Sequence, residues 1–326
     1  MSYRVKPGVE KGSPIPYLFN IGGNAAFAAV YAILMVLHLV RFFVERKKAR
    51  STAGNKSSSP PTTSHKWSLT LPVAEFFMFL GCVLRIVNRS HQQGITLYAV
   101  NNLFVILSPT AFIGFVYMMY GRLIAALDAD LPEKPAIRQR SYLSPFPPRL
   151  IGRIFIVSDF TCFLIQAAGG GLQATGDKNA ITGNHVFLAG VSLQLVCYAA
   201  FVVMVAVAHV RIARDIQPFN LSTIFVRSGS TNVASRLLAV TYIVSACILV
   251  RSAFRIAEMG EGYSGHLYNT ENFLFFLDIM PLAIGNAFWV IFWPPTEFRK
   301  IRNHMDQLSI PFASSSPSQE NKSLSY

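Results

Sequence analysis

Long runs of apolar residues, separated by short polar stretches, extend from about residue 17 to residue 295. Each run is long enough to cross about 30 Å of hydrocarbon as a helix. In a bilayer every backbone polar group must find its partner within the protein, and a helix achieves this alone. The pattern therefore predicts seven transmembrane helices, over residues 17–43, 68–88, 96–126, 151–172, 184–211, 237–259 and 271–293.

The same pattern predicts how the chain is divided. We expect an all-α fold whose seven-helix transmembrane domain spans residues 17–295. A short external tail is expected over residues 1–16. Residues 296–326 should form a flexible cytosolic tail, because their last part is rich in Ser and Pro.

Composition supports a membrane protein. Hydrophobic residues make up 52% of the chain and charged residues only 14%, whereas soluble domains carry about a quarter charged residues. The net charge of +13 raises the question of nucleic acid. The basic residues lie in short segments between apolar runs and form no separate basic domain, so we expect no nucleic-acid partner.

The basic residues also predict an orientation. Alternate loops and tails hold 21 Lys and Arg residues against 5 on the other side. Because cytosolic loops carry the excess of positive charge, the N-terminus should be external and the C-terminus cytosolic. The plasma membrane is the expected location, with the vacuolar and endoplasmic reticulum membranes as alternatives. The basic loops and tail could contact cytosolic partners or anionic lipids.

Arg251, Arg255 and Glu258 stand out in the sixth apolar run, after a stretch without any charge. Their spacing of four and three residues places them on one stripe of a helix. A charged side chain at membrane depth is costly unless it faces the bundle interior, a partner or a polar path. We therefore expect a buried polar stripe, and Glu258→Ala should lower both the amount of folded protein and its activity.

Other polar residues lie within or beside the predicted spans, and they allow two interpretations. They could pair with one another and hold the bundle together, or the acids in excess of the arginines could line a cavity for an amphipathic or cationic ligand or relay protons. On the second interpretation Asp159 and Gln166 should face a cavity together with Asp278, near the external half. The remaining candidates are Glu75, Arg85, Gln194 and Glu271.

Motifs for catalysis and metal binding are absent from the sequence. It contains no G-x-x-x-x-G-K-[ST] phosphate loop and no H-E-x-x-H zinc motif, and its histidines are scattered. The four cysteines all lie inside apolar runs, which argues against a disulfide framework or a zinc site. We expect a protein that is not an enzyme and that uses no cofactor or metal.

Several short motifs occur in a characteristic order along the spans. They are Leu107-Ser-Pro109, Tyr117, Gly121-Arg122, Phe155-Ile-Val-Ser-Asp159, Gln166-Ala-Ala-Gly169-Gly-Gly171, Gly183, Gly190-Val-Ser-Leu-Gln194, Phe201, Arg251-Ser-Ala-Phe-Arg255-Ile-Ala-Glu258, Gly262, Gly265, Glu271, Asp278-Ile-Met280 and Pro294. On these motifs the chain resembles the fungal RTA-like family of lipid-translocating exporters, which includes aminocholesterol-resistance and sphingoid-base-resistance proteins.

The second span departs from the family. The family's second helix resembles E-x-x-G-Y-x-x-R, and Gly81 and Arg85 fit this pattern. Met78 stands where the acid is expected, and Cys82 replaces the tyrosine. Glu75 lies one turn earlier and is a candidate substitute for the missing acid.

The resemblance implies a seven-helix protein that translocates or exports amphipathic lipids, such as sphingoid bases or sterol-like toxic amphiphiles, and contributes to lipid asymmetry and resistance. Its partners would be membrane lipids or amphipathic small molecules. The alternative is a seven-helix sensor or regulator of lipid stress that transports nothing itself. Lipid flux in liposomes that contain only the purified protein separates the two hypotheses.

Overall fold

The computed structural model describes seven stretches of the chain. The predicted external tail, residues 1–16, and residues 301–326 of the predicted cytosolic tail lie outside them. The described stretches are residues 17–53, 65–92, 94–129, 147–175, 177–215, 230–262 and 265–300.

All regular structure in these stretches is helical, which confirms the predicted fold class. Seven segments are long and apolar enough to cross a membrane, so the chain is an integral membrane protein. The last predicted helix is divided into three pieces. The elements are α1 (Ile21–Ala53), η1 (His65–Leu69), α2 (Thr70–Ser90), α3 (Ile95–Ala129), α4 (Pro148–Ala174), α5 (Asp177–Asp215), α6 (Ser230–Glu261), α7 (His266–Asn269), α8 (Glu271–Phe273), η3 (Leu274–Ile279) and α9 (Met280–Ile291).

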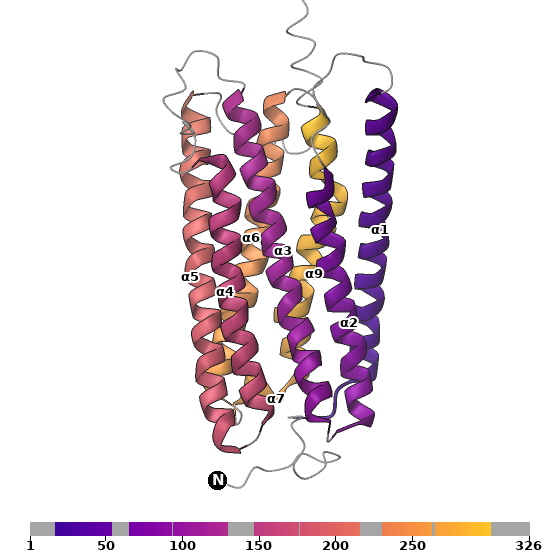
Figure 1. Cartoon of the computed structure of the whole chain (residues 1–326), viewed down its shortest axis with the longest axis vertical. Coiled ribbons are helices and arrows are strands. Elements are labelled where there is room, and N and C mark those ends of the chain that lie inside the picture. The colour runs from indigo at the N-terminus through magenta and orange to yellow at the C-terminus, as the bar shows by residue number, and fades with distance from the viewer. Residues whose placement is uncertain are drawn as a thin grey trace, which may run out of the picture.

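The long helices run side by side along the long axis of the molecule (Figure 1). Each packs against the next in chain order from α1 to α6, α6 packs against η3 and α9, and α9 returns to α1. The bundle is therefore a closed ring of helices in sequence order, and α3 also touches α6 across its interior. Because the ring closes, residues near the two ends of the chain become neighbours.

A π-helical turn, η3, interrupts the last transmembrane segment just before Pro281. The Met280 N–H donates to the carbonyl of Phe275, five residues back. Pro281 has no N–H, so a regular helix could not form every bond here, and π turns often accommodate such positions. The Tyr31 hydroxyl of α1 donates to the Ile279 carbonyl at 2.9 Å. The turn changes the direction in which the residues around Asp278 project.

Glycines bring α4 and α5 into backbone contact. A Cβ atom added to Gly169 would lie 2.5 Å from the backbone nitrogen of Phe187, and one added to Gly183 would lie 2.6 Å from that of Gln173. Both distances are shorter than real Cβ contacts, so only glycine fits at either position. Small residues allow such close approach of transmembrane helices. Helix α4 continues beyond the three consecutive glycines to Ala174 rather than ending at them.

Large aromatic side chains fill the bundle toward the end where α2 begins and α9 ends. Trp67 stacks on Phe115 with ring centroids 5.4 Å apart, and Phe115 meets Trp289 edge-on at 5.6 Å. Trp289 and Trp293 are fully buried. This end is the upper one in Figure 1, and it also contains the ion pair between Arg299 and the buried Glu45.

Candidate functional site

Six charged side chains gather at the opposite end of the bundle, and we call them the charged cluster. They come from the last turns of α2 and α6 and from the first turns of the last transmembrane segment. All are buried or nearly so in the protein. The cluster consists of Arg85, Arg251, Arg255, Glu258, Glu271 and Asp278.

Asp278 lies at the centre of this cluster and is held by two arginines. Arg255 grips it with two hydrogen bonds, from Nε to Oδ1 at 2.8 Å and from Nη2 to Oδ2 at 2.7 Å. The Nε of Arg251 lies 3.0 Å from the same Oδ1. Paired, charge-assisted bonds of this kind define orientation as well as energy. The π turn and the stripe on α6 thus meet at a single carboxylate.

Glu258 completes the stripe on α6 but is held less firmly. Its Oε2 accepts one hydrogen bond from Arg255 Nη1, at 3.1 Å. Its other oxygen has no hydrogen-bond partner in the described part of the chain. Arg251, Arg255 and Glu258 are all less than a tenth exposed, so the stripe faces the interior of the bundle.

Arg85 is the centre of a second group of contacts within the cluster. Its Nη2 donates to Glu271 at 3.0 Å and to the Tyr17 hydroxyl at 3.1 Å. Its Nε donates to Asn24 Oδ1 at 3.1 Å, and its guanidinium lies 4.1 Å from the centre of the Phe19 ring. Tyr17 and Phe19 precede the first helix and belong to no sequence motif. The sequence therefore did not indicate them as site residues.

Tyr17 remains a neutral phenol in this setting. Burial raises the pKa of its hydroxyl to about 12, although the neighbouring Arg85 charge opposes the shift. The hydroxyl oxygen can therefore accept the hydrogen bond from Arg85 over the whole physiological range.

The charged cluster is balanced, with three arginines and three acids. This differs from the expectation that Asp278 would share a ligand cavity with Asp159 and Gln166. That expectation is wrong, because both oxygens of Asp278 are occupied by Arg251 and Arg255. Asp159 faces the Tyr117 hydroxyl of α3 instead.

Asp159 lies near the middle of α4, with the Tyr117 hydroxyl of α3 facing it. It is only 1% exposed, and no Arg, Lys or His forms an ion pair with it in the described residues. Two turns further along α4, Gln166 Nε2 donates to Gln194 Oε1 of α5 at 2.9 Å. Gln166 thus joins α4 to α5, whereas both oxygens of Asp159 are buried without a hydrogen-bond partner in the described residues, and neither residue belongs to the charged cluster.

Glu75, the candidate substitute for the acid missing from the second-span motif, is paired with a histidine of α1. Its Oε1 lies 2.7 Å from Nδ1 of His38 in α1, and both side chains are completely buried. Glu75 therefore does not replace the acid missing at Met78, and Arg85 finds its acid in Glu271 instead. His38 was not among the sequence candidates, because a lone histidine in an apolar run gives no sign of its partner.

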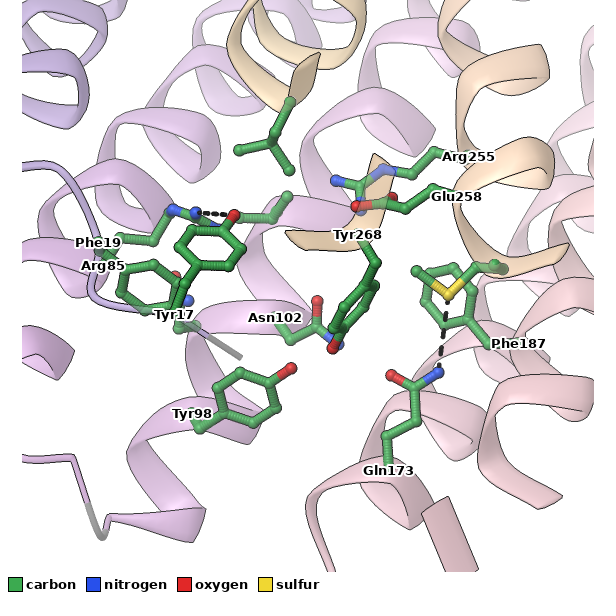
Figure 2. Close-up of a pocket in the computed structure, with 14 residues that line it drawn as sticks. Tyr17, Phe19, Arg85, Tyr98, Asn102, Gln173, Phe187, Arg255, Glu258 and Tyr268 are labelled. Carbon is green, nitrogen blue, oxygen red and sulfur yellow. Dashed lines mark hydrogen bonds and ion pairs between the residues drawn. The ribbon is translucent and has the colours of Figure 1, made fainter. Parts of the chain in front are cut away.

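A cavity of about 50 Å³ borders the charged cluster. A water molecule needs about 10–15 Å³ on this measure, so the cavity holds a few waters or a small polar group. Asn101 lines it, and the Oδ1 of this residue is buried without a hydrogen-bond partner in the described residues. Figure 2 shows Arg255 and Glu258 on one side, Tyr17 and Arg85 on the other, and Tyr98, Asn102 and Tyr268 between them. The lining residues are Tyr17, Phe19, Arg85, Tyr98, Asn101, Asn102, Val105, Gln173, Phe187, Arg255, Glu258, Met259, Tyr268 and Leu274.

Comparison with known protein families identifies the chain. The family described as RTA1 like protein matches residues 71–301. The chain belongs to the RTA1-like family. The match covers the elements from α2 to α9 and thus every member of the charged cluster, as well as Asp159.

Named relatives of this RTA1-like protein come from the yeast Saccharomyces cerevisiae. Protein RTA1 is 25% identical over 85% of this chain and 84% of its own length. Protoporphyrin uptake protein 1 is 24% identical over 84% of this chain and 94% of its own. Sphingoid long-chain base transporter RSB1 is 22% identical over 86% of this chain and 73% of its own. No solved structure matches the chain.

Proposed function

We propose that this RTA1-like protein translocates or exports amphipathic lipids, such as sphingoid bases or sterol-like toxic amphiphiles, and thereby contributes to lipid asymmetry and resistance. Two relatives support membrane transport in general, since one is named a sphingoid long-chain base transporter and another a protoporphyrin uptake protein. The proposal assigns movement of the substrate without chemical conversion. We also propose that the protein lies in the plasma membrane with its N-terminus outside, and that its basic loops contact cytosolic partners.

The cavity beside the charged cluster is the observation that carries the proposal. An amphiphile that leaves the membrane surface must exchange the hydration of its polar group for other partners. Two residues with incompletely paired acceptors line the cavity: Asn101, whose buried Oδ1 has no hydrogen-bond partner in the described residues, and Glu258, whose carboxylate accepts a bond from Arg255. Hydrogen-bond donors such as amine and hydroxyl groups suit this pair of acceptors.

A second function, lipid sensing without transport, has its own structural support. The polar cavity lies at one end of the bundle, and aromatic side chains including Trp67, Phe115 and Trp289 fill the other. Ligand binding at such a site without passage would suit a regulator.

The test is flux of a long-chain amine in liposomes that contain only the purified protein. We expect flux well above that of protein-free liposomes, and an Asn101→Leu variant should lose most of it. Asn101 Oδ1 has no partner to lose, so the variant should still fold. Asn286→Leu is the matched control, because Asn286 is also buried with an unpaired oxygen but lies in α9, away from the cavity. Ligand binding without flux would favour the sensor.

A further inference from the structure

A groove of about 200 Å³ lies between α3 and α4, separate from the polar cavity. Half of its lining residues are alanine or glycine, so the two helices leave space between them instead of filling it with side chains. An apolar cavity of about 150 Å³ in another protein is large enough for benzene, so this groove has room for several methylene groups. It is lined by Ala99, Val100, Asn102, Leu103, Ile106, Ala167, Gly170 and Gly171.

The three consecutive glycines of α4 have opposite roles on two faces of the helix. Gly169 packs directly on the backbone of α5. Gly170 and Gly171 border the groove on the side of α3. A Cβ atom on Gly171 would meet nothing within 4 Å, so the space beside it is open. The same short segment thus closes one interface and leaves the other open.

The groove lies within the segment Ile95–Leu127 of α3, which is long and apolar enough to cross a membrane. It begins one turn inside α3 and runs along that helix for about 10 Å, at 1.5 Å per residue. Val100 and Leu103 on its rim are exposed at the outer surface of the bundle. In a membrane this surface faces lipid, so an apolar chain fills the groove more favourably than water.

Asn102 connects the groove to the polar cavity, because it lines both. Its side-chain nitrogen lies 2.9 Å from where a Cβ atom on Gly170 would be, so the absence of a side chain at Gly170 lets Asn102 lie against α4. On the cavity side its neighbour Asn101 has the unpaired oxygen. Figure 2 shows Asn102 beside Tyr98 and Tyr268 within the cavity. Polar and apolar compartments therefore meet at one residue.

We propose that the groove between α3 and α4 binds the hydrocarbon chain of a single-chain amphiphile that enters sideways from the bilayer, and that its polar group passes Asn102 into the cavity. The inference rests on the proposed binding of amphiphiles, and it adds where the chain lies and from which side it arrives. Because the cavity is small, the polar group should be small and should donate hydrogen bonds. A primary amine on an unbranched chain meets both requirements.

The experiment uses the purified full-length protein in liposomes and octadecylamine with a photoreactive group midway along its chain. We expect cross-links within residues 99–106 and 167–171. Unlabelled octadecylamine should compete with the probe, and butylamine should not, because a four-carbon chain cannot fill the groove. Labelling spread equally over the outward faces of α1 and α5 would overturn the proposal.

Two variants fill the groove from opposite walls. Gly171→Leu and Ala99→Leu should each lower cross-linking about tenfold, which corresponds to the loss of about two buried methylene groups. Gly114→Leu is the matched control, because Gly114 is also in α3 with nothing near its Cβ position but does not line the groove. Undiminished cross-linking in both groove variants would refute the site.

The two proposals can fail separately. Specific cross-links in the groove without any flux would leave the chain site standing and refute transport. Flux that persists at the wild-type rate in both groove variants, with no groove cross-links, would leave transport standing and refute the chain site.

Discussion

Asp278 and Asp159 are two aspartates that are almost completely buried in the same bundle, yet their surroundings differ. Asp278 accepts hydrogen bonds from Arg255 and lies 3.0 Å from the Nε of Arg251. Asp159 faces the Tyr117 hydroxyl and has no ion pair in the described stretches. Burial alone therefore does not define the role of an intramembrane acid. Asp278 holds together the charged cluster that borders the cavity. The carboxylate of Asp159 forms no ion pair or hydrogen bond in the described stretches.

Asp278→Asn should produce the largest effect. The substitution keeps the shape but leaves Arg251 without an acid and Arg255 with Glu258 alone. Removing one partner from a buried ion pair typically costs about 3–5 kcal/mol, so the free energy of unfolding should fall by that amount. Thermal unfolding of purified protein in detergent, or the yield of folded protein, measures it. A loss below about 1 kcal/mol would show that Asp278 does not hold the cluster together.

Tyr17→Phe should have an intermediate effect at the edge of the same cluster. It removes the phenol oxygen that accepts a hydrogen bond from Arg85. A hydrogen bond to a charged group contributes up to about 3 kcal/mol to the free energy of unfolding. We expect a loss of about 1–2 kcal/mol at neutral pH. The measurement is unfolding of wild type and variant side by side.

The pH dependence sharpens the Tyr17 prediction. Because the folded protein raises the pKa of Tyr17 to about 12, above the unfolded value of about 10, it holds this proton more tightly than the unfolded chain does. The contribution of the neutral phenol to stability is therefore complete below about pH 10 and is lost as the pH rises toward 12. Wild type should lose more stability than Tyr17→Phe between about pH 10 and 12. Equal slopes would contradict the assignment.

Asp159→Asn should have the smallest effect on stability. No cation loses its partner, and neither carboxylate oxygen of Asp159 has a hydrogen bond to lose in the described residues, so the change should stay within about 1 kcal/mol. The same substitution at Asp278 is the matched comparison, since both residues are less than 2% exposed. Unchanged abundance together with lost tolerance of a toxic long-chain amine would assign Asp159 a functional role. A stability loss as large as that of Asp278→Asn would remove the contrast between the two acids.

The sequence alone determined which segments cross the membrane and which face of the sixth span is polar. Both follow from the helix itself, because length and hydropathy decide the spans and a period of 3.6 residues decides the shared face of Arg251, Arg255 and Glu258. The resemblance to the RTA1-like family was likewise readable from ordered motifs, and the family match confirms it.

Only the tertiary structure decided which charges meet. Arg85 and Glu271 are 186 positions apart in the chain, and Glu75 meets His38 only because α1 packs on α2. Such pairings depend on the rotation and axial shift of each helix relative to its neighbours, and the periodicity of a single helix leaves both undefined. The π turn before Pro281 and the opposite packing of Gly169 and Gly171 are decided in the same way, by the helices that surround them.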